Sequence, residues 1–158
     1  MKWPHDTPGA PAAGENRPDP ADAEATFGQV LRRESDAAMA LVGRGQIRAD
    51  LGRYDSALDD LDCALQSPLG RDIEADARSA RALALAGLGR VAEARRELAA
   101  SFQLDPDRPR SRLRAARMAA ILGEPSEMRA EIERALSGRP SLSSVERDSA
   151  NRLLDSLR

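Results

Sequence analysis

The stretch Leu88-Gly89-Arg90-Val91-Ala92-Glu93-Ala94, which continues to Asp105-Pro106, decides the fold. It predicts a tight turn at the glycine, one amphipathic helix and a stop at the proline. The pattern returns 34 positions later, where the matching pairs are Gly89 and Gly123, Leu98 and Ile132, Ser101 and Ala135, and Pro106 and Pro140. It also occurs once upstream, at an offset of 37, in Gly52, Tyr54, Ala57, Leu61 and Ala64. A period near 34 residues is typical of stacked helix pairs, in which no pair can bury its apolar face alone.

The chain divides into four parts around these repeats. Residues 1–20 contain five prolines, which fix φ and remove backbone donors, and we expect a disordered Pro-rich tail there. Residues 21–37 are rich in helix-forming residues and predict an N-terminal helical extension. Residues 38–140 hold three helix–turn–helix repeats. Residues 141–158 predict a C-terminal capping helix, because Ser143 and Glu146 have capping-box spacing and an apolar stripe follows at Ala150, Leu153, Leu154 and Leu157.

With this period of helix–turn–helix units, residues 38–140 resemble the tetratricopeptide repeat family. That family keeps small residues where the two helices of each repeat press together, since short side chains let helix backbones approach closely. Counted outward from each turn glycine, the positions that the resemblance assigns to this role hold Gly45, Ala57, Ala64, Ala82, Ala94, Ser101, Ala116, Met128 and Ala135, and only the methionine is large. The resemblance implies an all-α fold, an α–α superhelix built as a right-handed solenoid of helix–turn–helix repeats.

Two features depart from the family's pattern. The large aromatic near the start of each repeat is replaced, in chain order, by Leu41, Arg78 and Arg112. In the third repeat, Pro125 stands where the other two repeats have Tyr54 and Val91. The first two repeats therefore match the family more closely than the third.

In this family the first helix of each repeat lines a concave surface that takes an extended peptide or a partner helix. The resemblance implies a protein–protein interaction module, a scaffold or adaptor, with groove residues Met39, Val42, Gln46, Ser79, Leu83, Arg110, Leu113, Arg114 and Arg117. One subclass clamps a C-terminal carboxylate with lysine, asparagine and arginine. Arg110 and Arg114 fill the cationic positions of the third repeat, but the remaining positions hold Val42, Gln46 and Ala80, so the full clamp is absent.

The stretch from Arg108 to Arg117 contains five arginines and no acidic residue. Arg110, Arg114 and Arg117 fall on one helix face at i, i+4 and i+7. One interpretation is an anchor for an acidic partner peptide, held by charge-assisted and bidentate hydrogen bonds. The other is a solvated face in an arginine-rich chain, which is the more frequent role of a charge run.

The sequence offers little for catalysis. His5 is the only histidine and lies in the Pro-rich tail, which removes histidine-based triads and histidine metal sites. Asp59, Asp60 and Asp62 cluster on one predicted helix, where a solvated face is more frequent than a metal site. The sequence also lacks a glycine-rich phosphate loop. We therefore expect no enzyme, no cofactor and no metal.

Composition bears on the compartment and the class of partner. The net charge of −2 gives no field that favours nucleic acid, and the arginine stretch lacks interleaved aromatics. No apolar run is long enough to span a membrane. Cys63 is the only cysteine and is predicted to be a small buried hydrophobe; a single cysteine allows no internal disulfide and favours a cytoplasmic location.

Two alternatives to a general interaction module stay open. The first is a dedicated chaperone or adaptor that shields an apolar segment of one client protein, as three-repeat secretion chaperones of similar length do. The second is a structural module that self-associates, for example as a homodimer, through exposed repeat faces or the C-terminal helix. In the general module and in the chaperone the partner is another protein, bound as a peptide segment or a helix, whereas in the self-associating module it is a second copy of the chain.

Overall fold

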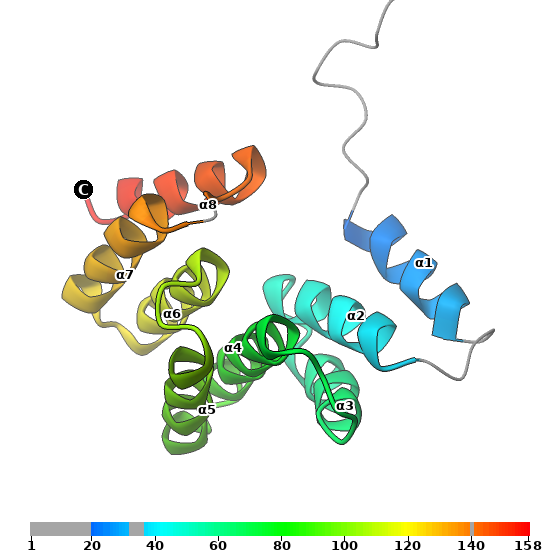
Figure 1. Cartoon of the computed structure of the whole chain (residues 1–158). Helices are drawn as coiled ribbons and strands as arrows, with labels where there is room; N and C mark the ends of the chain where they lie inside the picture. The colour runs from blue at the N-terminus through cyan, green and yellow to red at the C-terminus, as the bar shows by residue number, and fades with distance from the viewer. Residues whose placement is uncertain (1–19, 32–36, 140) are drawn as a thin grey trace, which may run out of the picture.

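Helix pairs joined by tight turns make up the computed structural model, which describes residues 20–31, 37–139 and 141–158 (Figure 1). The helices are α1 (Pro20–Leu31), α2 (Ala38–Asp50), α3 (Tyr54–Ala64), α4 (Arg71–Gly87), α5 (Val91–Leu104), α6 (Pro109–Leu122), α7 (Pro125–Ser137) and α8 (Ser144–Asp155). The described residues contain no strand, so the predicted all-α class is confirmed. The prediction for the tail lies outside the described residues except at Pro20, and Pro140 also lies outside them.

The three turn glycines adopt the left-handed conformation that the repeat pattern requires. Gly52, Gly89 and Gly123 have φ of 78°, 77° and 70°, a region that glycine enters without the steric cost of a Cβ. Each following residue donates its backbone N–H back to the fifth residue before it, at 2.8 to 2.9 Å, as in a Schellman turn. The second helix of each repeat then begins one residue later. Pro125 fits here because it is the first residue of α7, where a proline loses no intrahelical hydrogen bond.

The predicted close-approach positions are buried in all three repeats. Every one of the nine residues, from Gly45 to Ala135, falls in the buried class, and Met128 is only 3% exposed. A Cβ on Gly45 would lie 2.7 Å from the Cγ of Leu61, which leaves no room for a larger residue. The small side chains therefore set how closely the two helices of a repeat approach.

We expect Ala94→Leu to destabilise the protein far more than Ala92→Leu. Ala94 is fully buried where α5 meets α4, whereas Ala92 is exposed on the same helix. Overpacking a tight contact costs about 1–3 kcal/mol, and an exposed substitution stays near zero. Urea unfolding of the two variants measures the difference. Equal midpoints would show that the assigned helix phase is wrong.

The first helices of the repeats form one row. The two helices of each repeat pack along their lengths, and α4 also contacts both α2 and α6. Figure 1 shows α3, α5 and α7 on one side of this row, with α1 and α8 toward its opposite side at the two ends. This arrangement is the superhelix expected from the repeat period. Its inner side, formed by α2, α4 and α6, is the side on which the family resemblance places a groove.

The C-terminal helix α8 covers the last repeat, as its sequence predicts. Ser143 is the N-cap, and its hydroxyl oxygen accepts a 3.3 Å bond from the Glu146 backbone N–H, which completes the predicted capping box. Ala150 is fully buried, and the stripe residues Leu153, Leu154 and Leu157 pack against the core cluster of α6 and α7. The predicted cap is therefore confirmed, and it also brings Glu146 beside the start of α6.

A carboxylate occupies the same position in the second helix of every repeat, directly before a core residue; the three are Asp60, Glu97 and Glu131. Asp60 accepts two bonds from Arg44, at 2.9 and 2.7 Å, and one from Arg48, at 2.9 Å. The hydrogen bond to Asp60 raises the pKa of Arg44 against the opposing effect of burial. In the other repeats Arg78 donates to Glu97 at 3.2 Å and Arg112 donates to Glu131 at 3.1 Å.

These ion pairs explain how the chain replaces the missing aromatics. Arg78 and Arg112 stand where the family carries a large aromatic, and each joins the two helices of its repeat by a charge-assisted bond. Arg112 also lies 3.9 Å over the centre of the Phe102 ring, which belongs to the preceding repeat. Paired charges thus hold helices together where aromatic packing is expected.

Two predictions for α3 are wrong. Asp60 is not on a solvated face but is 4% exposed, because its carboxylate is enclosed by arginines of α2. Cys63 is exposed rather than buried. Leu61 is one of the α3 residues that face the neighbouring helices. Because an α-helix has 3.6 residues per turn, Cys63, two positions later, lies on the opposite, outer side of α3.

Candidate partner-binding groove

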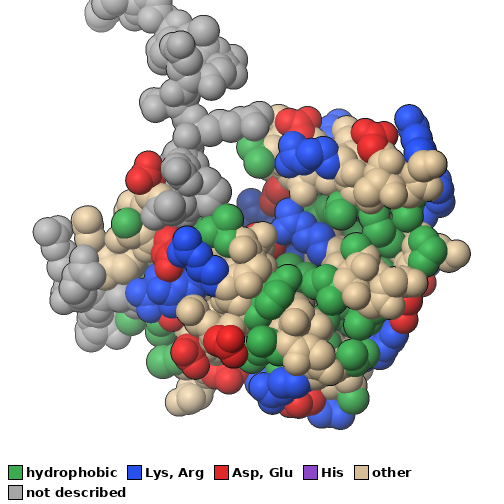
Figure 2. Space-filling model, turned by 180° about the vertical axis from the view of Figure 1, so that it is seen from behind, with side chains coloured by type: hydrophobic (Ala, Val, Ile, Leu, Met, Phe, Trp, Pro, Cys, Tyr) green, Lys and Arg blue, Asp and Glu red, His purple; other side chains and the backbone are tan. Residues whose placement is uncertain are grey.

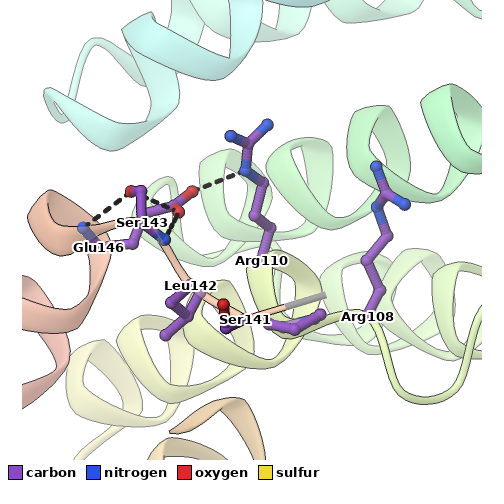
Figure 3. A pocket seen from close by; sticks show the side chains of 7 residues that line it. Arg108, Arg110, Ser141, Leu142, Ser143 and Glu146 are labelled. Atoms are coloured by element: carbon purple, nitrogen blue, oxygen red, sulfur yellow. Dashed lines mark hydrogen bonds and ion pairs between the residues drawn. The ribbon is translucent and has the colours of Figure 1, made fainter. Parts of the chain in front are cut away.

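Two adjoining pockets form a groove between α6 and the N-terminal end of α8. The larger, of about 330 Å³, is lined by Arg108, Pro109, Arg110, Ser141, Leu142, Ser143 and Glu146 (Figure 3). The smaller, of about 40 Å³, is lined by Asp50, Arg110, Leu113, Arg114, Arg117 and Glu146. We call these residues together the α6–α8 groove. Figure 2 shows basic side chains in a hollow near the centre of one face, next to acidic ones.

The three predicted arginines all lie in this groove, because their spacing of i, i+4 and i+7 places them on the same face of α6. Arg110, Arg114 and Arg117 all lie on α6 and line the smaller pocket. Each is bound to groups of the chain itself. The Arg110 Nε donates to Glu146 of α8 at 2.6 Å (Figure 3), and both of these residues line both pockets. Arg117 donates to Asp50 Oδ1 at 2.7 Å and to a serine hydroxyl of α8 at 2.8 Å.

Arg114 differs from the other two arginines in its burial. It is 6% exposed, whereas the side chains of Arg110 and Arg117 are 52% and 26% exposed. Its guanidinium donates to the Ser79 hydroxyl at 3.3 Å and to Asp50 Oδ2 at 3.4 Å, which are long bonds. The interpretation of the arginine stretch as a solvated face is therefore wrong for Arg114, which packs between α4 and α6.

The role of Arg108, the N-cap residue of α6, was not predicted from the sequence. Its Nε and Nη2 donate to the two carboxylate oxygens of Asp76, both at 2.7 Å, and Asp76 is 3% exposed. The hydrogen bond to Asp76 is the largest influence on Arg108 and raises its pKa. Arg108 is part of the arginine-rich stretch, but its partner Asp76 lies 32 positions earlier in the chain. No pattern of neighbouring residues in the sequence therefore indicates this ion pair.

The remaining predicted groove residues separate into buried and accessible ones. Met39 is exposed and Gln46 is half-buried, both on α2. The other side chains contact neighbouring helices and are almost fully buried: Val42, Ser79, Leu83 and Leu113. Neighbouring first helices pack directly on one another, which encloses these residues between them. A role in contacting a partner stays a proposal for the accessible residues.

Glu146 lines the groove and also belongs to the capping box that stabilises the start of α8. Its carboxylate accepts hydrogen bonds from the Ser143 hydroxyl at 2.7 Å and from the Ser143 backbone N–H at 2.9 Å. Burial raises the pKa of Glu146, but the bonds from Ser143 and the charge of Arg110 outweigh it, so the net pKa shift is downward. The ionised form of Glu146 is therefore the one that stabilises the folded chain.

We expect Glu146→Gln to destabilise the protein at neutral pH but not in acid. The pKa of Glu146 is lower in the folded than in the unfolded chain, so its stabilisation is present above the unfolded pKa of about 4.3 and is lost as the pH falls through the folded pKa. The loss at pH 7 should be about 0.3–1 kcal/mol, typical of a charge at a helix N-terminus. Urea unfolding at pH 7 and pH 3 tests this. The same loss at both pH values would contradict it.

None of the helices in the described part of the chain is long and apolar enough to cross a membrane. Among the same residues, no group of three or more histidine, cysteine, aspartate or glutamate side chains is placed to hold a metal ion. The chemistry that the groove displays is that of guanidinium and carboxylate groups, which bind by charge and hydrogen bonds.

Three stacked helix pairs closed by a terminal helix define the class of helical repeat proteins. A model of the tetratricopeptide repeat matches residues 15–69 and 79–143, which is more than half of the chain. The chain therefore belongs to the tetratricopeptide repeat family. The first match also includes α1, which the internal repeat pattern did not connect to the repeats. No curated protein and no solved structure matched the chain.

Proposed function

We propose that the chain is a non-enzymatic protein-interaction module that binds an acidic segment of a partner protein in the α6–α8 groove. Tetratricopeptide repeats generally mediate protein–protein interaction. The observation that carries the proposal is the convergence of three arginines of α6 on one pocket, one of them almost fully buried. A guanidinium can bind a carboxylate through two parallel hydrogen bonds, so this pocket favours acidic ligands over neutral ones.

The present partners of the arginines do not prevent such binding. The ion pairs of Arg110 with Glu146 and of Arg117 with Asp50 are partly exposed to solvent. Exposed pairs contribute only about 0–1 kcal/mol each, because water screens the charges and the side chains lose freedom. A partner segment with several carboxylates can therefore compete for the same guanidinium groups.

Charge reversal of the two accessible arginines tests the proposal. A partner isolated by affinity capture is titrated against the full chain and against the double variant Arg110→Glu, Arg117→Glu. We expect the dissociation constant to rise about tenfold or more, because two attractive contacts become repulsive. The matched control is Arg95→Glu with Arg129→Glu, which makes the same change of charge at exposed positions on α5 and α7.

The outcome separates the three functional classes. An acidic-segment binder loses affinity in the groove variant and not in the control. A chaperone that shields an apolar segment keeps its affinity in both variants, since apolar burial of about 25 cal/mol per Å² does not depend on these charges. A module whose only function is self-association would change mass with concentration in light scattering and bind no other protein. Either of the last two results would contradict the proposal.

A further inference from the structure

The guanidinium of Arg114, a residue that lines the smaller pocket, has unused hydrogen-bonding capacity. Its two bonds to groups of α4, the Asp76 carbonyl oxygen and the Ser79 hydroxyl, are 3.4 and 3.3 Å long. Across the described residues, its Nε is the one buried side-chain nitrogen or oxygen without a hydrogen-bond partner. An unmade bond on a buried charged group is unfavourable, so Arg114 is suited to receive an additional or better-placed acceptor.

The carboxylate that now lies against Arg114 comes from the first repeat. Asp50 is the last residue of α2 and stands 64 positions before Arg114 in the chain. One of its oxygens is 2.7 Å from Arg117 Nη1 and the other is 3.4 Å from Arg114 Nη2. Its side chain is 36% exposed. Asp50 therefore occupies the anion position of the smaller pocket while remaining in contact with solvent.

The link that Asp50 makes between α2 and α6 consists of side chains alone. Both helices pack against α4, but α2 and α6 are not among the helix pairs whose backbones are in contact. Releasing the Asp50 carboxylate therefore separates no packed helices. The pair of Asp50 with Arg117 is partly exposed on both sides, and a pair of this kind is readily exchanged for another, because its net stabilisation is small.

From these contacts we infer that Asp50 is an internal occupant of the partner site, replaced at Arg114 and Arg117 by an aspartate or glutamate side chain of the acidic partner segment. The inference rests on the proposed function and adds a regulatory element to it. The occupant is a carboxylate at the end of a short side chain, so the position accepts a side-chain carboxylate. A chain terminus is not needed. The partner binds only the fraction of molecules in which Asp50 has left, which weakens its apparent affinity by that fraction.

Substitution of Asp50 removes the competitor. The probe is a fluorescent peptide of alternating glutamate and glycine with an acetylated N-terminus and an amidated C-terminus; its matched peptide carries glutamine in place of glutamate. Fluorescence anisotropy measures binding to the full chain and to Asp50→Asn and Asp50→Ser. The control is Asp59→Asn, which makes the same change of charge at an exposed position on α3. Circular dichroism verifies that each variant is folded.

We expect both Asp50 variants to bind the acidic peptide about two- to sixfold more tightly than Asp59→Asn, the range that follows if the internal ion pair has the strength of an ordinary exposed one. Equal affinities for the Asp50 variants and the control, with the acidic peptide still preferred over the glutamine peptide, would overturn the inference and leave the proposed function standing. No preference for the acidic peptide in any chain would overturn both. A gain confined to a peptide with a free C-terminal carboxylate would overturn the assignment to a side chain.

Discussion

Leu61→Ala is expected to lower the free energy of unfolding by about 2–5 kcal/mol, the range for removing a fully buried leucine side chain. Leu61 is 0% exposed and lies in the core cluster that α2 to α6 share. It also lies against Gly45, so the cavity would open where the two helices of the first repeat meet. That contact cannot close around the smaller side chain without moving both helices.

Leu51→Ala is the matched control for this substitution. Leu51 is 43% exposed at the end of α2, and the same truncation should change stability by less than about 0.5 kcal/mol. Urea unfolding followed by circular dichroism gives both values. A small loss at Leu61, comparable to that at Leu51, would show that the repeat core is not packed as described.

Arg114→Glu should destabilise the fold by about 3–5 kcal/mol, because it places an uncompensated charge in a buried position. The glutamate would face the negative carboxylate of Asp50 and the carbonyl oxygen of Asp76, neither of which can donate a hydrogen bond to it. Arg110→Glu is the comparison, since half of the Arg110 side chain is exposed and its single ion pair is a surface pair. We expect a loss of about 1 kcal/mol or less there.

Chemical denaturation of the two variants distinguishes a buried from a solvated cation. If Arg114→Glu were as stable as Arg110→Glu, the Arg114 side chain would be as solvated as that of Arg110, and its burial between α4 and α6 would be wrong. The result also fixes the design of binding experiments. Loss of binding in an Arg114 variant reports on the fold as well as the site, whereas Arg110 and Arg117 report on the site.

Features of the fold that depend on local sequence could be predicted. The left-handed glycines, the small residues at helix contacts and the capping box at Ser143 are all determined by residues a few positions apart. Their recurrence at a fixed period then predicts the stacking of the repeats. The burial of Cys63 was wrongly predicted from residue type, although the spacing of the core residues in α3 already places it on the outer side.

The candidate site could be predicted only in part. The spacing of Arg110, Arg114 and Arg117 placed them on one helix face, but it carried no information about their partners. Asp50 and Glu146 reach the arginines from a different repeat and from the capping helix, at separations of 67 and 36 residues from Arg117 and Arg110. Such contacts depend on the tertiary path of the chain, so a solvated face and an internally paired groove look alike in the sequence.

Binding of an acidic partner by the guanidinium groups of the α6–α8 groove is tested most directly by a salt series. The dissociation constant of the acidic glutamate–glycine peptide is measured from about 50 to 500 mM sodium chloride, over which the screening length falls from above 10 Å toward 4 Å. We predict that binding weakens steadily with salt for the unaltered chain and is weak at every salt concentration for Arg110→Glu with Arg117→Glu. A dissociation constant that does not change with salt, and that is the same for the double variant, would contradict the account.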